Sequence, residues 1–223
     1  MGSFVRTWLS TPHVEVGEKA TQALGDLLEV DCDRRSSAGI DTKMNGMQLA
    51  GTRPGQGLLW RRIFQDRDIY GLVLSLCSFK TVGTEEDQLD ERQKSLAQGR
   101  LLRILPKLAA LDFHTVTHTH FPDIEQQYGL QEGEHGLLFF AMVDMVDKQD
   151  VLMHLNLIDV FIEFLGQMST TELTQPTLDY LASLTKKVAG SDGVLYKSLE
   201  AIAVSPDSPP ELVDLLVKLS RHQ

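Results

Sequence analysis

The chain has 223 residues, and its 21 Lys and Arg against 31 Asp and Glu give a net charge of −10. Apolar residues make up 42 % and charged residues 23 %, as in ordinary globular proteins, so wholesale disorder is excluded. Two cysteines, Cys32 and Cys77, are too few for a disulfide framework and indicate a reduced intracellular protein.

The sequence also argues against membrane, secreted and nucleic-acid-binding classes. The longest apolar run, Leu137 to Val143, is far shorter than a membrane span, and residues 1–9 lack the apolar core of a secretion signal. Because the net negative charge repels phosphates and acidic lipid, we expect no direct nucleic-acid partner and no membrane partner. A protein with a basic or neutral surface is the expected partner.

The N-terminal half alternates helical patterns with irregular segments. The spacing of apolar residues predicts helices at 11–30, 58–64, 66–78 and 84–111. Thr11 and Pro12 should form the start of the first helix, and Pro106 should kink or end the fourth. Residues 31–57 hold five of the 17 glycines and predict a long flexible loop. Residues 114–133 are turn-rich and predict irregular structure.

The last ninety residues are the most regular part of the chain. Helix starts are predicted near His135, Asp150, Pro176 and Ser191, and the second pair lies 41 residues after the first. Ser208-Pro209-Pro210-Glu211 combines a capping box with proline at the first helical position, and it predicts the start of a last helix.

No segment alternates apolar and polar residues as a half-buried strand does, so the predicted fold class is all-α. Paired helices that repeat at about 41 residues are typical of HEAT and armadillo units. We therefore predict a HEAT/armadillo-like α-solenoid of paired antiparallel helices, with residues 1–223 as a single domain. The last helix is apolar on two sides, which suggests the N-terminal part of a longer chain. A compact helical bundle is the alternative.

No group of residues predicts catalysis or metal binding. His114 and His118 would share one face of a helix and could bind zinc with His120 or His135 as a third ligand, but a loop with solvent-facing histidines is the favoured interpretation. The glycine-rich segment at 51–57 lacks the Gly-Lys-Ser/Thr ending of a P-loop. We predict no catalytic residue, no metal and no cofactor, and hence no enzymatic activity.

Polar stripes on otherwise apolar helices are more informative. Residues 151–165 are almost entirely apolar apart from His154, Asn156, Asp159 and Glu163, and the last three lie within about 60° of one another on a helix. We expect the rest of this helix to be packed on both flanks, with the narrow polar strip as its one solvent-exposed edge. The segment 66–78 has a similar stripe that includes Asp68 and Ser75, and the carboxylates Asp144 and Asp147 precede residue 150. We predict that these seven residues line a partner-binding groove, because solenoids usually bind along an extended concave surface.

Two stretches resemble known proteins as wholes. The segment from Val14 to Leu28 resembles the second helix of a HEAT or armadillo unit. The segment Gly57-Leu58-Leu59-Trp60-Arg61-Arg62-Ile63-Phe64-Gln65-Asp66-Arg67-Asp68-Ile69-Tyr70-Gly71 resembles the N-terminal region of a fungal family. That family comprises the armadillo/HEAT-like chaperones that assemble the ATPase base of the proteasome regulatory particle, and it also carries a high-spontaneous-mutation, DNA mismatch repair label.

The resemblance implies a non-enzymatic assembly chaperone whose groove holds the C-terminal domain of one proteasomal ATPase subunit. It implies a cytoplasmic protein that is also found in the nucleus. The family proteins are longer than this chain, in agreement with the apolar last helix. The alternative is a general α-solenoid adaptor for peptide segments of other proteins, although the Asn and Trp ladders that such adaptors use are scarce in this sequence.

Overall fold

The computed structural model describes residues 1–33, 55–80, 89–131, 135–190 and 192–221, and every regular element in these ranges is a helix. The first helices are α1 (Gly2–Ser10), α2 (Val14–Asp31), α3 (Leu58–Phe64), α4 (Arg67–Cys77) and α5 (Glu91–Leu111). The short α6 (Phe113–Thr117), α7 (Pro122–Tyr128) and α8 (Leu137–Phe139) follow, and α8 continues into the π-helical η2 (Phe140–Asp144). The last helices are α9 (Val151–Ser169), α10 (Gln175–Ala189), α11 (Gly193–Val204) and α12 (Pro210–Arg221). The predicted all-α class is confirmed.

Acidic and hydroxyl side chains fix most of the long helix starts. The carboxylates of Asp66, Asp90, Asp150 and Asp192 each accept hydrogen bonds from the first backbone amides of α4, α5, α9 and α11, and Asp90 forms a capping box with Gln93. These contacts are local in sequence, which is why the starts near residues 66, 150 and 191 were predictable.

Several predicted boundaries are wrong. The first predicted helix begins at Val14, after Pro12, and the Thr11 hydroxyl accepts from the His13 amide outside the helix. Pro106 does not end α5, which continues as an α-helix to Leu111. The segment 114–133, predicted to be irregular, contains most of α6 and all of α7.

The N-terminal segment forms α1, a helix that the prediction omitted. Its apolar residues Val5, Trp8 and Leu9 recur at helical spacing and are buried. Most of the predicted flexible loop, residues 34–54, lies outside the described residues. The residues that flank it are joined, because the Gly57 amide donates to the Asp31 carbonyl at 2.8 Å and the Leu59 amide donates to the Asp31 carboxylate.

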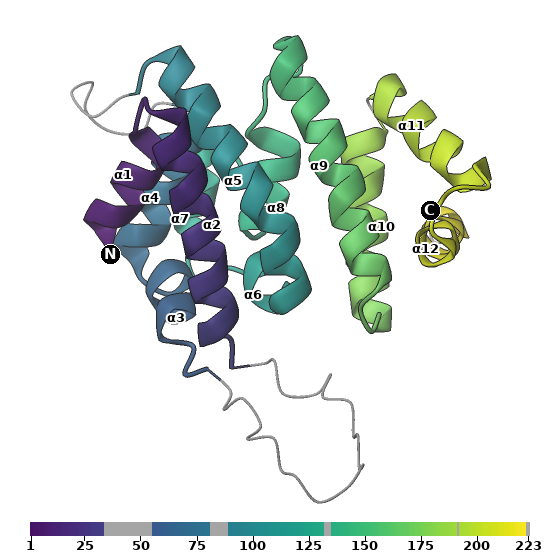
Figure 1. Cartoon of the computed structure of the whole chain (residues 1–223), viewed down its shortest axis with the longest axis horizontal. Helices are drawn as coiled ribbons and strands as arrows, with labels where there is room; N and C mark the ends of the chain where they lie inside the picture. Colours follow the sequence, from purple (N-terminus) through teal and green to yellow (C-terminus); the bar gives the residue numbers. More distant parts are fainter. Residues whose placement is uncertain (34–54, 81–88, 132–134, 191, 222–223) are drawn as a thin grey trace, which may run out of the picture.

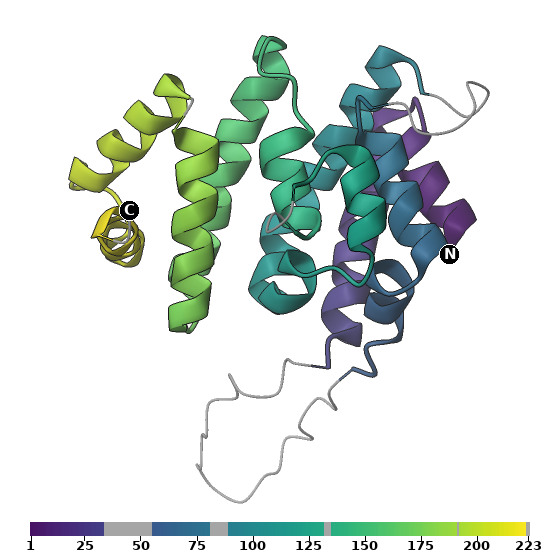
Figure 2. The same cartoon turned by 180° about the vertical axis from the view of Figure 1, so that it is seen from behind.

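The helices form two layers that follow the chain along the long axis of the molecule. Figure 1 shows α2, α5 and α9 side by side in the front layer, all running in the same direction, and α5 contacts both of its neighbours. Figure 2 shows α4, α7, α8 and α10 in the other layer. The buried apolar side chains form one continuous cluster from Val5 in α1 to Leu219 in α12.

Arg100 joins α5 to α1 and to the start of α2. Arg100 is 3 % exposed, and its guanidinium donates to the Trp8 and Leu9 carbonyls at 3.0 and 2.8 Å, and to the His13 carbonyl at 3.3 Å. A Cβ at position 17 would lie 2.0 Å from the Arg100 Nε, so only glycine fits there. The end of α1 and the start of α2 are thereby held against α5.

Helix α9 has the length and the mean hydropathy, 1.4, of a membrane-spanning helix. Core helices of this composition pass the same test, and 44 % of the window is buried inside the protein. The predicted absence of a membrane partner therefore stays a prediction.

Candidate functional site

Helix α9 presents one exposed face that is part apolar and part acidic. Asp150 fixes its start by accepting from the Leu152 and Met153 amides at 3.0 and 3.2 Å. At 100° per residue, Leu152, Asp159 and Glu163 lie within about 40° of one another, and all three are exposed. The face thus begins with a leucine at the first turn and continues with two carboxylates along the next three turns.

The predicted stripe on α9 is present, but it is not the narrow polar edge that the sequence suggested. Asp159 and Glu163 are exposed as predicted, whereas Asn156 is half-buried toward α5, with its Nδ2 4.0 Å from the position of a Cβ at Gly99. The expectation that the remaining circumference is packed is wrong at the N-terminal turns. Leu152 is 79 % exposed and Leu155 48 %. Apolar anchors therefore lie beside the carboxylates.

The carboxylates of this face have no cationic partner in the part of the chain that the structure describes. No ion pair joins Asp159 or Glu163 to another residue in the described part of the chain, and Glu163 accepts only an amide hydrogen bond from Gln167 at 3.1 Å. We call the exposed surface made by Leu152, Leu155, Asp159 and Glu163 the α9 face. Its charges are available to a partner with cationic side chains.

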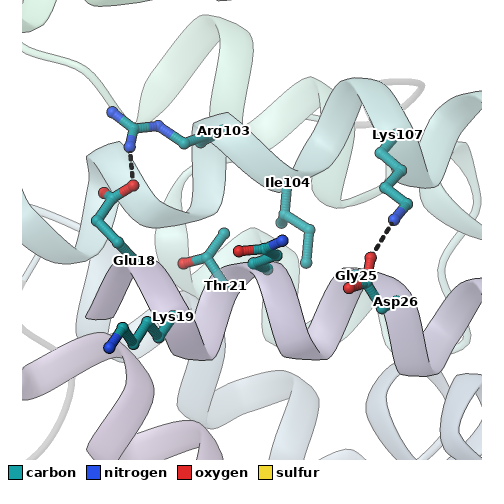
Figure 3. A pocket seen from close by; sticks show the side chains of 9 residues that line it. Glu18, Lys19, Thr21, Gly25, Asp26, Arg103, Ile104 and Lys107 are labelled. Carbon is teal, nitrogen blue, oxygen red and sulfur yellow. Dashed lines mark hydrogen bonds and ion pairs between the residues drawn. The ribbon is translucent and has the colours of Figure 1, made fainter. Parts of the chain in front are cut away.

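The neighbouring surface between α2 and α5 is charged as well, but its charges are paired. Figure 3 shows Arg103 turned to Glu18 and Lys107 turned to Asp26. The Lys107 Nζ lies 2.8 Å from the Asp26 carboxylate and 3.0 Å from that of Glu29. A hollow of about 290 Å³ lies between these pairs. Two cations of α5 thus pair with three carboxylates of α2.

The stripe predicted on α4 lies partly against α7. Ser75 is half-buried, and its hydroxyl donates to the Leu72 carbonyl at 2.9 Å. Gly71 faces Ile124 of α7, whose Cδ1 would lie 3.7 Å from a Cβ at that position. The small side chains of this stripe let α7 pack close to α4, and the prediction that Ser75 binds a partner stays a prediction.

Asp68 is exposed in the first turn of α4, in the layer opposite to α9. Asp144 ends η2, and Asp147 lies in the turn before α9; both are exposed. Asp147 accepts from the Gln149 amide at 2.8 Å and so shapes this turn. Asp144 and Asp147 therefore lie just before α9, next to the predicted residues on that helix. Asp68 lies on a separate surface.

A buried carboxylate that the prediction missed joins α4, α7 and the start of α8. Glu125 is fully buried and accepts from the Tyr70 hydroxyl at 2.5 Å and the Gly136 amide at 3.0 Å, while His135 lies 3.6 Å away. Burial raises the pKa of Glu125, and the hydrogen bonds from Tyr70 and Gly136 oppose this shift. Nothing near Glu125 in the sequence distinguishes it from a solvated acid.

A second buried acid joins the N-terminal ends of α9 and α11. The Asp192 carboxylate lies 2.5 Å from the His154 Nε2 and accepts from the Val194 and Leu195 amides. Burial pushes the pKa of Asp192 upward, but the hydrogen bonds from His154, Leu195 and Val194 outweigh it and the net shift is downward. This pair fixes α9 at the turn that carries Leu152.

The histidine cluster forms no metal site within the described residues, where no group of three His, Cys, Asp or Glu side chains has suitable geometry. The rings of His114 and His118 stack on each other at 4.0 Å. Cys32 and Cys77 are both buried, and burial strongly raises the pKa of the Cys77 thiol.

No family model, curated protein sequence or solved structure matches the chain. The geometry of the α9 face and the resemblance in the N-terminal segment are therefore the basis for assigning a function.

Proposed function

We propose that the chain is a HEAT/armadillo-like α-solenoid that acts as a protein-binding scaffold, with the α9 face as its principal binding surface. Two layers of helices that follow the chain along one axis, with α2, α5 and α9 parallel in one layer, are the arrangement expected of stacked helical repeats. Such proteins bind partners through surfaces built by successive helices of one layer.

The observation that carries the proposal is the composition of the α9 face. Exposed leucines beside unpaired carboxylates resemble the centre and rim of a protein–protein interface. The net charge of −10 adds long-range attraction for a basic partner and speeds its association. The proposed partner is thus a folded domain with an apolar centre and lysine or arginine side chains around it.

The resemblance of the N-terminal segment suggests which domain this is. We propose a non-enzymatic assembly chaperone that binds the C-terminal domain of one proteasomal ATPase subunit and shields an assembly surface until the next partner displaces it. The scaffold needs no catalytic group or cofactor for this role.

A peptide adaptor is the weaker candidate. Adaptors for extended peptides need side chains such as Asn and Trp exposed along the groove. Here Trp8 and Trp60 are buried at 4 % and 5 % exposure, and Asn156 is half-buried against α5. The α9 face fits a curved domain surface better than an extended peptide.

The test measures the affinity of purified C-terminal domains of the proteasomal ATPase subunits, one at a time, by calorimetry at physiological salt. We expect one subunit to bind, and the Asp159→Lys/Glu163→Lys double variant to weaken it at least about tenfold, since like charges across an interface cost several kcal/mol.

The matched control is the double variant Glu172→Lys/Asp207→Lys, which makes the same change in net charge at exposed loop positions. Its affinity should stay within about threefold of that of the parent, because salt screens charges that are far from the interface. Equal losses in both variants would show a general charge effect and contradict the α9 face. Failure of every subunit to bind would contradict the chaperone assignment.

A further inference from the structure

Helix α2 carries an apolar stripe on the side that faces away from α5. Five residues at alternating intervals of four and three form this α2 stripe: Val16, Ala20, Ala23, Leu27 and Val30. The leucine and the two valines are between 49 % and 71 % exposed, Ala23 is exposed and Ala20 is half-buried. Leu27 lies about 160° around the helix from Glu29, which pairs with Lys107 of α5, so α5 does not cover the stripe.

The spacing of the α2 stripe is that of a coiled-coil seam. Apolar residues at alternating intervals of four and three occupy the a and d positions of a heptad, the pattern of two helices that pack side by side. In α2, Ala20 and Leu27 occupy a positions, and the other three residues of the stripe occupy d positions. The exposure of the large side chains shows that the described part of the chain supplies no helix to pack against them.

A second copy of α2, running antiparallel, fits the α2 stripe in shape. In antiparallel pairs an a residue faces a d residue, so the register that joins Val16 to Leu27 of the second copy also joins Ala20 to its Ala23. Two-fold symmetry repeats both contacts. The large side chains then form two outer layers, and the alanines form two central layers that allow the helices to approach closely.

The charges beside the α2 stripe are complementary in the same register. Lys19 and Asp26 are exposed and occupy g positions, and g faces g in an antiparallel pair, so Lys19 of each copy meets Asp26 of the other. Lys19 forms no ion pair within the described ranges. Asp26 contacts Lys107 at 2.8 Å, but that ammonium also contacts Glu29, so the Asp26 carboxylate can accept a second cation. A parallel pair would instead place Lys19 beside the buried Leu24.

The geometry points to a homodimer of this chain in which two α2 helices pack antiparallel along the α2 stripe. The seam is about 21 Å long, which is short for a stable interface, and the net charge of −10 on each copy opposes association. The expected dissociation constant is therefore on the order of 10 to 100 µM at physiological salt. The inference does not rest on the α9 face, because its test measures self-association alone.

The test is sedimentation equilibrium of the whole chain from about 5 to about 500 µM at physiological salt. The average mass should rise with concentration from that of one chain toward that of two chains. A mass that stays at that of one chain over the whole range would overturn the inference and leave a different protein as the occupant of the α2 stripe.

A pair of matched variants assigns the dimer to α2. Leu27→Glu buries a carboxylate in the seam and should weaken self-association at least about tenfold. Val194→Glu on α11 is the control, because Leu27 and Val194 are both 53 % exposed and the two variants change the net charge equally. The control should stay within about twofold of the parent. Equal losses in the two variants would overturn the assignment.

A charge exchange tests the antiparallel register. Lys19→Glu turns two attractive contacts into two repulsive ones and should weaken the dimer at least about fivefold. The double variant Lys19→Glu/Asp26→Lys has the net charge of the parent and restores both pairs with reversed signs, so its affinity should return to within about twofold of the parent. Circular dichroism checks that both variants retain the helical fold. A double variant that remains as weak as Lys19→Glu would overturn the proposed pairing.

Discussion

The α2–α5 surface and the α9 face lie in one layer of helices, yet they differ in how their charges are used. Arg103 and Lys107 of α5 pair with three carboxylates of α2, so those carboxylates have partners within the fold. Asp159 and Glu163 of α9 have no such partner among the described residues. The comparison shows that carboxylates of the same kind can complete a fold in one helix and remain available to a partner in the next.

The largest expected loss of stability distinguishes the buried face of α9 from its exposed face. Leu157 is 1 % exposed, and Leu157→Asp should cost at least about 4 kcal/mol of unfolding free energy, because it buries an unpaired charge. Chemical denaturation followed by circular dichroism measures this loss.

Leu152→Asp makes the same change on the exposed face and should alter stability by no more than about 0.5 kcal/mol. A comparable loss in both variants would mean that the α9 face is covered in solution, and the contrast between α9 and the α2–α5 surface would fail.

The next largest expected loss of stability distinguishes two arginines that lie one turn apart on α5. Arg100→Ala should cost about 3 kcal/mol, since the Trp8, Leu9 and His13 carbonyls lose their buried donor. Arg103→Ala removes only an exposed pair with Glu18 and should cost less than about 1 kcal/mol. Urea unfolding midpoints of the two variants give the comparison directly, and equal midpoints would contradict it.

A smaller effect concerns the attachment of α9 to α11. Asp192→Asn keeps the cap acceptor but removes the charge that faces His154, so it should cost about 1–2 kcal/mol at pH 7. The pKa of Asp192 is lower in the folded protein than in the unfolded chain. The ionised carboxylate therefore contributes its full stabilisation of the fold above the unfolded pKa of ~4, and this contribution is lost as pH falls through the folded pKa. The difference between parent and variant should therefore shrink below about pH 4 in thermal unfolding scans.

Glu125→Gln is the contrasting variant, because the pKa of Glu125 is shifted in the opposite direction. In the parent, Glu125 binds a proton more readily in the folded state than in the unfolded state. The parent should therefore gain stability relative to this variant as pH falls through the folded pKa toward ~4.3. If both variants showed the same pH dependence, the opposite electrostatic roles of the two buried acids would be refuted.

Helical class and most long-helix positions followed from the sequence, because their causes are local. A carboxylate at residue 66, 90 or 150 reaches amides two or three positions later, and an apolar period of three to four residues marks the buried side. The same rules placed Asp159 and Glu163 on one helix face. The same rules would also have predicted α1, because its buried residues have this spacing. The prediction omitted this helix because it lies at the start of the chain.

Only the tertiary structure decided which polar stripes are surface. Ser75 and Gly71 have the spacing of an exposed edge, but α7 packs over them because small residues allow close approach. Glu125 is buried because Tyr70 and Gly136, distant in sequence, supply its hydrogen bonds. Leu152 is exposed because no helix among the described residues covers that side of α9 at its first turn. Periodicity specifies a helix face, whereas the neighbour that covers it or leaves it open depends on contacts between segments far apart in the chain.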